Sequence, residues 1–212
     1  VSMDPQPQKY LPPLSWSALT SFYDFFCSLF GLGKKFKRKI LDCTQLSDDM
    51  AVVDIGCGTG VFLEMLKRKY PRVSCIGVDP DAKALSIAQR RLKRAGLAVE
   101  LNQAFAQSLP LGDHSVDLCV STLAFHHMPN EVKRQAMKEI YRVLKPGGHV
   151  VIADFGKSEG TFLRKVLFFE KLEYLEGNLK GYIENYIKEV GFHSYEIVGR
   201  HFPGINIVRA RK

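Results

Sequence analysis

The chain has 212 residues, of which 46% are hydrophobic and 25% charged, and these values predict one soluble globular domain with a sizeable core. Five cysteines, an odd number without a C-x-x-C pair, exclude a disulfide framework and predict reduced thiols in the cytoplasm. The net charge is +8, and of the chain's basic clusters only the first, at 34–39, is kept open as a contact with an anionic surface. The longest apolar stretch, 22–32, contains Asp24 and is far shorter than the roughly 20 residues that a membrane-spanning helix needs.

The amino-terminal part changes character at Ser15. Residues 1–14 are rich in proline, so we expect an extended or disordered lead-in, and they lack the basic and apolar pattern of a signal peptide. From Ser15, apolar residues recur every three or four positions and predict an amphipathic helix that ends at Gly31; a second helix follows over about 34–43. Because both helices precede the first strand, we expect residues 15–45 to form a helical lid at the start of a single domain, 15–212.

The stretch 51–60 predicts a strand, a tight turn and the start of a helix. An apolar run that contains Asp54 leads into three glycines at alternate positions, Gly56, Gly58 and Gly60. Without side chains at these positions, a ligand can lie directly against the main chain. A dinucleotide fingerprint would need its third glycine at position 61, which is Val61, and no phosphate-loop Lys-Ser or Lys-Thr pair follows. A phosphate ligand is therefore disfavoured here.

A second acidic residue indicates which ligand this loop serves. The apolar run 73–78 predicts the next strand, and Asp79-Pro80 stands at its carboxyl end, about 20 residues after the glycines. In doubly wound folds an acid at this place accepts hydrogen bonds from the ribose hydroxyls. The predicted ligand therefore has a free ribose and no phosphates.

The rest of the chain alternates predicted helices and strands. Together with the first two strands, this order predicts an α/β fold with a doubly wound, seven-stranded, mostly parallel sheet and an antiparallel final strand. We expect residues 161–190 to form a helical insertion that walls the substrate pocket together with the amino-terminal lid. The predicted elements are helices over 81–95, 130–143 and 179–190, and strands over 98–104, 116–120, 149–155, 195–199 and 205–211.

Four motifs in this order carry a family resemblance. The segments 52–60, 77–79, 108–110 and 144–148 resemble the ordered motifs of class I S-adenosylmethionine-dependent methyltransferases. The resemblance is good over about residues 15–155, and it is closest to the small-molecule type that includes quinone-biosynthesis and bacterial phospholipid methyltransferases. It implies a Rossmann-like methyltransferase fold, S-adenosylmethionine as the methyl donor and S-adenosylhomocysteine as the product.

The resemblance also implies which residues bind this cofactor. A Tyr-Asp pair in the family reaches the methionine end, and Tyr23-Asp24 matches it. Phe105 stands where the family usually has an acid beside adenine, so Phe105 could stack on or border the ring while the backbone of Ala106 reads its edge. The candidate cofactor-binding residues are Tyr23, Asp54, Gly56, Cys57, Gly58, Gly60, Asp79, Pro80, Phe105, Ala106 and Ser121.

The acceptor should bind where strand 116–120 ends, because ligands of such sheets lie at the switch point between strands one and four. His126 and His127 follow this strand and are the candidate catalytic residues, as proton acceptors; a purely structural role is the alternative. No Asn-Pro-Pro-Tyr type loop is present, so we expect no DNA substrate, and no ligand-spaced cluster predicts a metal. The expected acceptor pocket has aromatic walls, namely Phe22, Phe25, Phe26, Phe162 and Phe168.

The sequence therefore predicts S-adenosylmethionine-dependent methyl transfer to a small, largely apolar or lipid-like acceptor, at carbon, oxygen or nitrogen. Two alternatives stay open: an RNA or protein methyltransferase, supported only by the charge, and a non-catalytic scaffold that binds cofactor or lipid, motivated by Phe105. We hypothesise that the aromatic helix and the basic run 34–39 allow weak peripheral contact with an anionic membrane. The basic clusters at 67–69 and 90–94 are interpreted as solvated helix faces.

Overall fold

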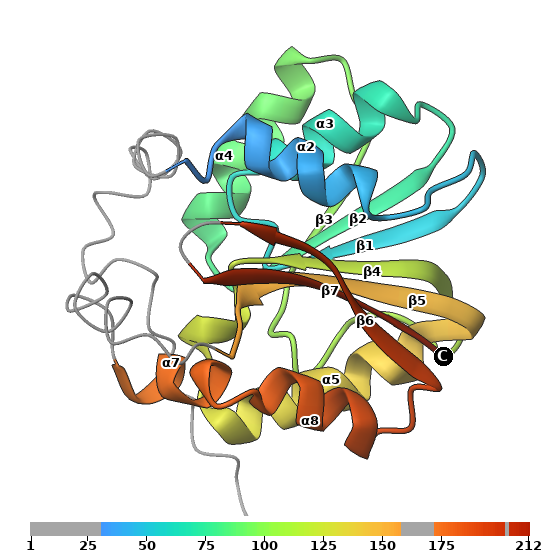
Figure 1. The fold of residues 1–212 in the computed structure, drawn as a ribbon. Helices are drawn as coiled ribbons and strands as arrows, with labels where there is room; N and C mark the ends of the chain where they lie inside the picture. Colours follow the sequence, from blue (N-terminus) through green and yellow to red (C-terminus); the bar gives the residue numbers. More distant parts are fainter. Residues whose placement is uncertain (1–30, 158–171, 202–203) are drawn as a thin grey trace, which may run out of the picture.

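A computed structural model describes residues 31–157, 172–201 and 204–212 (Figure 1). Seven strands form one sheet in the order β3-β2-β1-β4-β5-β7-β6. Each pair of neighbours is parallel, except that β7 runs antiparallel to both β5 and β6. This confirms the predicted fold class. The strands are β1 (Ala51–Ile55), β2 (Ser74–Asp79), β3 (Glu100–Gln103), β4 (Val116–Thr122), β5 (Leu144–Phe155), β6 (Ser194–His201) and β7 (Ile205–Arg211).

Helices cover both faces of the sheet (Figure 1). The layer drawn above the sheet contains α2 (Lys34–Asp42), α3 (Val61–Lys69) and α4 (Ala82–Arg94). The layer below contains α5 (Asn130–Val143), α7 (Leu172–Leu179) and α8 (Tyr182–Glu189). Apolar residues of α2, α3 and α4 form one cluster against the sheet, which also includes Leu175 of α7, and those of α5 and α8 form the other, because buried strands present side chains to both faces. A short 3₁₀ helix, η2 (Phe125–His127), follows β4.

The centre of the sheet positions the ligand site. β1 pairs in parallel with β2 on one side and with β4 on the other, so the carboxyl ends of these three strands meet at one edge. The chain crosses from one face to the other between β1 and β4, and such a switch point leaves a crevice outside the strand ends. The glycine loop follows β1 here, and η2 follows β4.

Some predicted boundaries were wrong. β5 begins at Leu144 instead of 149, because Leu144 already pairs with Val116 of β4. The helix predicted over 179–190 is divided by Gly181, which has φ +80° and precedes α8. The parts of the predicted lid and insertion at 15–30 and 161–171 lie outside the described residues.

One face of α5 also differs from the prediction. The apolar periodicity of this helix predicts Val132 on the core face, but Val132 is only half-buried, and its neighbour Lys133 is 0% exposed. The sequence pattern hid this lysine because apolar residues surround it on the same helix. A buried ammonium group needs polar partners, and these lie at the strand edge described below.

Among the described residues, no helix is both long and apolar enough to cross a membrane. The cysteines at 43, 57, 75 and 119 are free thiols.

Candidate active site

The glycine loop between β1 and α3 leaves space for a ligand at one position and is closely packed at another. Gly56 has φ +74°, and a Cβ added there would lie 2.5 Å from Cβ of Ala124, so the loop packs directly against the segment after β4. Gly58 has φ +53°, and an added Cβ would meet nothing within 4 Å among the described residues. The loop is therefore fixed to the fold at Gly56 and open at Gly58, as a main-chain ligand cradle requires.

Asp79 is joined to this loop by hydrogen bonds. Its Oδ2 accepts from the backbone N–H of Gly58 at 2.8 Å, and its Oδ1 accepts from that of Asp81 at 2.9 Å. Burial raises the pKa of Asp79, and these two N–H groups partly offset the shift. Each carboxylate oxygen has a second acceptor direction, so the group can hold the loop and still accept from two hydroxyls of a ribose.

Asp54 lies deeper, at the end of β1. Its burial raises the pKa to about 7, and Lys37 opposes the shift. The Oδ1 atom of Asp54 accepts no hydrogen bond from the described residues, although it is buried. A buried carboxylate oxygen without a donor is costly, and a ligand with an N–H or ammonium group near the loop would supply one.

Cys57 contributes only its backbone to the loop. A Cβ added at Gly77 would lie 3.0 Å from Sγ of Cys57, so the thiol points into the core, where burial raises its pKa well above the usual value. Ser121 is also turned away from the crevice, because its hydroxyl donates to the carbonyl of Ile55 at 2.9 Å and joins β4 to β1.

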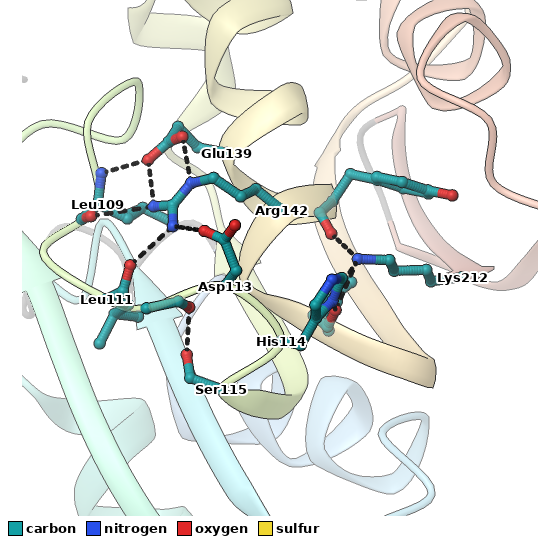
Figure 2. Close-up of polar contacts among 11 residues, drawn as sticks. Leu109, Leu111, Asp113, His114, Ser115, Glu139, Arg142 and Lys212 are labelled. Atoms are coloured by element: carbon teal, nitrogen blue, oxygen red, sulfur yellow. Dashed lines mark hydrogen bonds and ion pairs between the residues drawn. The ribbon is translucent and has the colours of Figure 1, made fainter.

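The segment after β3, 104–113, borders the place expected for adenine. Ala106 is buried, whereas Phe105 is 39% exposed. Figure 2 shows that side chains of α5 hold this segment from behind. Glu139 Oε2 accepts from the N–H of Leu109 at 2.8 Å, and Arg142 donates to the carbonyls of Leu109 and Leu111 at 3.3 and 2.9 Å.

The acid Asp113 closes this network (Figure 2). Arg142 donates to Asp113 at 2.6 Å and to both oxygens of Glu139, and these pairs lower the pKa of both acids. Arg142 therefore contacts the segment at its middle and at its end, and it links both places to α5.

A second polar group lies where β4 and β5 end. His126 of η2 and Asp154 of β5 are both buried, and Nδ1 of His126 lies 2.8 Å from Oδ1 of Asp154. Asp154 also accepts from the backbone N–H groups of Phe125, His126 and Phe155, and from Nδ2 of Asn178 in α7 at 3.1 Å. Burial alone would raise the pKa of Asp154, but His126 and these donors hold it below its usual value. The carboxylate is therefore charged and fixed.

The two histidines, which the sequence did not distinguish, have different surroundings. The ring of His127 stacks on that of His126, with centroids 3.9 Å apart. Burial and the neighbouring His126 hold the pKa of His127 well below its usual value, so His127 is neutral near pH 7. Of the two, His126 has the side-chain contact with Asp154.

Lys133 and Asn178 complete this cluster. Nζ of Lys133 lies 3.5 Å from Oδ1 of Asn130, and burial lowers the pKa of Lys133 to about 8, with Asp154 opposing the shift. A Cβ added at Gly177 would lie 2.2 Å from Oδ1 of Asn130, so α7 packs directly on the start of α5. Asp154, Lys133 and Asn178 were missed by sequence reasoning. The polar Asp154 at the end of an apolar strand was the one available signal.

Backbone strain and buried polar atoms without a hydrogen bond to the described residues occur at the same edge of the sheet, after β4. Leu123, which follows β4, has φ +54°, a conformation that costs a non-glycine residue free energy and is concentrated at functional sites. Oγ1 of Thr122 and Oδ1 of Asn178 are buried and accept or donate no hydrogen bond within the described chain. The edge thus offers polar atoms to two ligands, one on the glycine loop and one beside His126.

Most of the predicted site residues come together at this edge. Asp54, Asp79 and the loop 56–60 border one part of it, and the histidines border the other. Tyr23, Asp24 and the five phenylalanines predicted to wall the acceptor pocket lie outside the described residues. The open cradle at Gly58 and the partnerless oxygen of Asp54 fit a nucleoside with an amino group, as S-adenosylmethionine has.

Comparison of the sequence with known proteins shows which family the chain resembles. The family described as "Methyltransferase domain" matches residues 52–148. A demethylmenaquinone methyltransferase of Thermus thermophilus is 30% identical over 171 residues, which cover 78% of this chain and 77% of the relative. A ubiquinone/menaquinone biosynthesis C-methyltransferase of Geobacter sulfurreducens is 30% identical over 166 residues, covering 76% of this chain and 64% of that protein.

The fold is found in solved structures as well. A crystal structure described as a SAM-dependent methyltransferase from Aquifex aeolicus has a TM-score of 0.66 at 22% identity, covering 82% of this chain and 88% of that one. The order of the motifs, the relatives and the seven-stranded sheet all indicate the same family. The chain belongs to the class I S-adenosylmethionine-dependent methyltransferases of the quinone-biosynthesis type.

Proposed function

We propose that this enzyme transfers the methyl group of S-adenosylmethionine to a ring carbon of a quinol-type, largely apolar acceptor, with His126 as the proton acceptor. The observation that carries the proposal is the buried contact of 2.8 Å between His126 and Asp154, next to the glycine loop. The two relatives, one a demethylmenaquinone methyltransferase and the other a quinone-biosynthesis C-methyltransferase, support this class of acceptor.

The contact determines which nitrogen of His126 can act as a base. An ionised carboxylate only accepts hydrogen bonds, so the Nδ1 atom facing Asp154 carries the proton. Nε2 then carries no proton, so it is the basic nitrogen of this tautomer. When Nε2 takes up a proton, the fixed charge of Asp154 stabilises the imidazolium that forms.

A ring carbon needs this help because it is a weak nucleophile. When bound, S-adenosylmethionine supplies a methyl group already activated by its positively charged sulfur. Nε2 of His126 takes the proton of an acceptor hydroxyl, which raises the electron density at the neighbouring ring carbon. S-Adenosylmethionine would supply the methyl group to that carbon and would leave as S-adenosylhomocysteine. His126 then returns its proton to the ring oxygen as the ring C–H proton leaves to solvent, so that one proton is released for each methyl group transferred. The fold must hold the two partners in line and exclude water.

We assign the cofactor half of the edge by the same chemistry. Asp79 accepts from the ribose hydroxyls, and the loop 56–60 carries the methionine end. Asp54 receives the amino group of that end, because its buried Oδ1 atom accepts no hydrogen bond within the described part of the chain. Phe105 and Ala106 border adenine. The hydroxyl of Ser121 donates within the sheet, so we assign this residue a structural part.

The two histidines provide a matched test. We expect His126→Gln to lower kcat for a demethylated naphthoquinol by a factor of about 10² to 10⁴, the usual contribution of a positioned base. His127→Gln, which changes the neighbouring ring, should keep kcat within about tenfold. Binding of S-adenosylhomocysteine, measured by calorimetry, should not change in either variant. Equal losses of kcat in the two variants, or no methylation of any quinol by the wild type, would contradict the proposal.

We further infer that α2 contacts an anionic membrane, where an acceptor with an apolar tail would partition. Phe36, Ile40 and Leu41 of α2 are buried, whereas Lys34, Lys35 and Arg38 are exposed on its other side. Such basic side chains contribute about 1 kcal/mol each near an anionic surface. Lys34→Gln with Lys35→Gln should lower co-sedimentation with anionic vesicles at low salt, whereas Lys138→Gln with Lys188→Gln should not. Absence of wild-type co-sedimentation would exclude the contact.

A further inference from the structure

The two helical layers differ strongly in charge. The helices α2, α3 and α4 together carry thirteen lysines and arginines and two acids. The helices α5, α7 and α8 carry five lysines and arginines and six acids. The basic excess of the helices therefore lies on one side of the sheet, the upper side in Figure 1.

This basic layer contains a groove between α3 and α4. The groove has a volume of about 580 Å³, and it is lined by Glu64, Arg68, Ile87, Arg90, Arg91, Arg94 and Ala95. The sequence suggested two separate solvated helix faces, at 67–69 and 90–94. The fold instead brings one arginine of α3 and three of α4 to a single hollow.

The positive charges of the groove exceed its negative charge. Glu64 pairs with Arg68 at 3.0 Å and with Arg91 at 3.5 Å, so one carboxylate serves two guanidinium groups. Arg91 also donates to the carbonyl of Thr59 in the glycine loop at 2.9 Å. Arg90 and Arg94 are exposed and form no ion pair with any residue that the structure describes.

The helix dipole explains only part of this arrangement. Cations are favourable in the last turn of a helix, and Arg91, Lys93 and Arg94 occupy that turn of α4. Arg68 occupies the last turn of α3 in the same way. The dipoles act equally on Lys93, which does not line the groove, so they do not explain why the arginine side chains of two helices face one hollow. Arg90 and Arg94 are four residues apart, where like charges destabilise a helix by about 0.2 to 0.5 kcal/mol. An anion in the groove would offset this repulsion.

We propose that the groove between α3 and α4 is a binding site for a phosphate-bearing ligand. Guanidinium groups match phosphate oxygens with two parallel hydrogen bonds, and arginine is favoured over lysine at such sites. The volume lies within the range of small-molecule sites, roughly 300 to 1,000 Å³. Ile87 and Ala95 add an apolar contact for the remainder of the ligand. A free phosphorylated metabolite and a phospholipid headgroup share this chemistry.

Tripolyphosphate is the probe for this site, and Arg90→Gln with Arg94→Gln is the test variant. We expect the double variant to bind tripolyphosphate at least tenfold more weakly than the wild type in calorimetry at low salt. The matched control, Lys138→Gln with Lys188→Gln, removes two exposed charges from the other layer and should stay within twofold. Arg91 is left intact because it holds the Thr59 carbonyl. Unchanged binding of S-adenosylhomocysteine would show that both variants keep the cofactor site.

Vesicles containing phosphatidylglycerol distinguish the two sources of phosphate. Binding to vesicles but not to tripolyphosphate, lost in the groove variant alone, would assign the site to a headgroup. Binding to tripolyphosphate alone would assign it to a free ligand. Equal weakening in the groove variant and its control, with either probe or with single-stranded RNA, would show unspecific charge attraction and overturn the proposal. So would the absence of saturable binding to both probes by the wild type.

Discussion

The candidate site lies at the edge of the sheet where the carboxyl ends of the strands meet. Its two halves, one at β1 and β2 and the other at β4 and β5, are built in different ways. In the β1–β2 half, main-chain geometry makes the site: a glycine loop open at Gly58, with Asp79 accepting from its backbone. In the β4–β5 half, side chains make the site: His126, Asp154, Lys133 and Asn178 come from η2, β5, α5 and α7. A backbone cradle suits a cofactor of constant shape. A side-chain cluster on a common frame can be changed to suit a particular acceptor.

The difference extends to charge. Asp79 and Asp54 have their pKa raised by burial, so the half that we propose for the cofactor holds carboxylates whose burial is not fully compensated. Asp154 has its pKa lowered, because five donors converge on it before any ligand binds. We infer that the cofactor half is completed by its ligand, whereas the base of the acceptor half is organised in advance. Substitutions in each half should therefore separate binding from turnover.

Asp154→Asn should have the largest effect. An asparagine amide can turn its NH₂ group toward Nδ1 of His126, which would favour the tautomer with the proton on Nε2 and remove the base. We expect kcat to fall by a factor of about 10² to 10⁴, with unchanged binding of S-adenosylhomocysteine. Steady-state kinetics measures kcat, and calorimetry on the same preparation measures the affinity for S-adenosylhomocysteine. A loss of cofactor affinity as large as the loss of kcat would show that the two halves are not separable.

Asp79→Ala should produce the opposite pattern. The variant removes the acceptor proposed for the ribose hydroxyls and releases the N–H of Gly58. We expect S-adenosylhomocysteine to bind more weakly by about 1 to 3 kcal/mol, the usual cost of unpaired buried polar groups. Asp81→Ala, two residues later, removes the cap that accepts from Lys83 and Ala84, so it should lower stability and leave affinity nearly unchanged. Unchanged affinity in Asp79→Ala would mean that the ribose lies elsewhere.

These two halves also differ in how far the sequence predicts them. The glycine spacing and the acid at the end of β2 are local patterns with a known geometry, so Asp54, Asp79 and the loop could be located from residue order alone. Asp154 meets His126 only because β5 pairs with β4, and Asn178 donates to Asp154 from α7. Lys133 lies on an apolar helical face, where periodicity predicts core packing. Contacts between distant elements require the fold, and the pattern of one element cannot supply them.

Lys133→Met should reveal the buried charge through pH. Because burial lowers the pKa of Lys133 to about 8, the unfolded chain binds more protons than the folded chain between about pH 8 and 10.5. Stability from this group therefore rises with pH, by about 1 to 2 kcal/mol between pH 7.5 and 9.5. Urea unfolding at both pH values should show this gain in the wild type and in Lys138→Met, an exposed control on α5, but not in Lys133→Met. An equal gain in unfolding free energy in all three proteins would show that the ammonium group of Lys133 is solvated in the folded protein.

Arg142→Gln should have the smallest effect, and it tests whether the cofactor half depends on side chains behind it. Arg142 touches no expected ligand, but it holds the carbonyls of Leu109 and Leu111 (Figure 2). Losing these contacts should loosen the segment beside adenine, so we expect binding of S-adenosylhomocysteine to weaken by about 0.5 to 1.5 kcal/mol, with little change in kcat at saturation. Arg134→Gln on the same helix, which loses surface ion pairs with Glu131 and Glu189, is the control and should bind normally. If Arg142→Gln lowers kcat but leaves affinity unchanged, the segment serves the acceptor, and the division between the two halves must be redrawn.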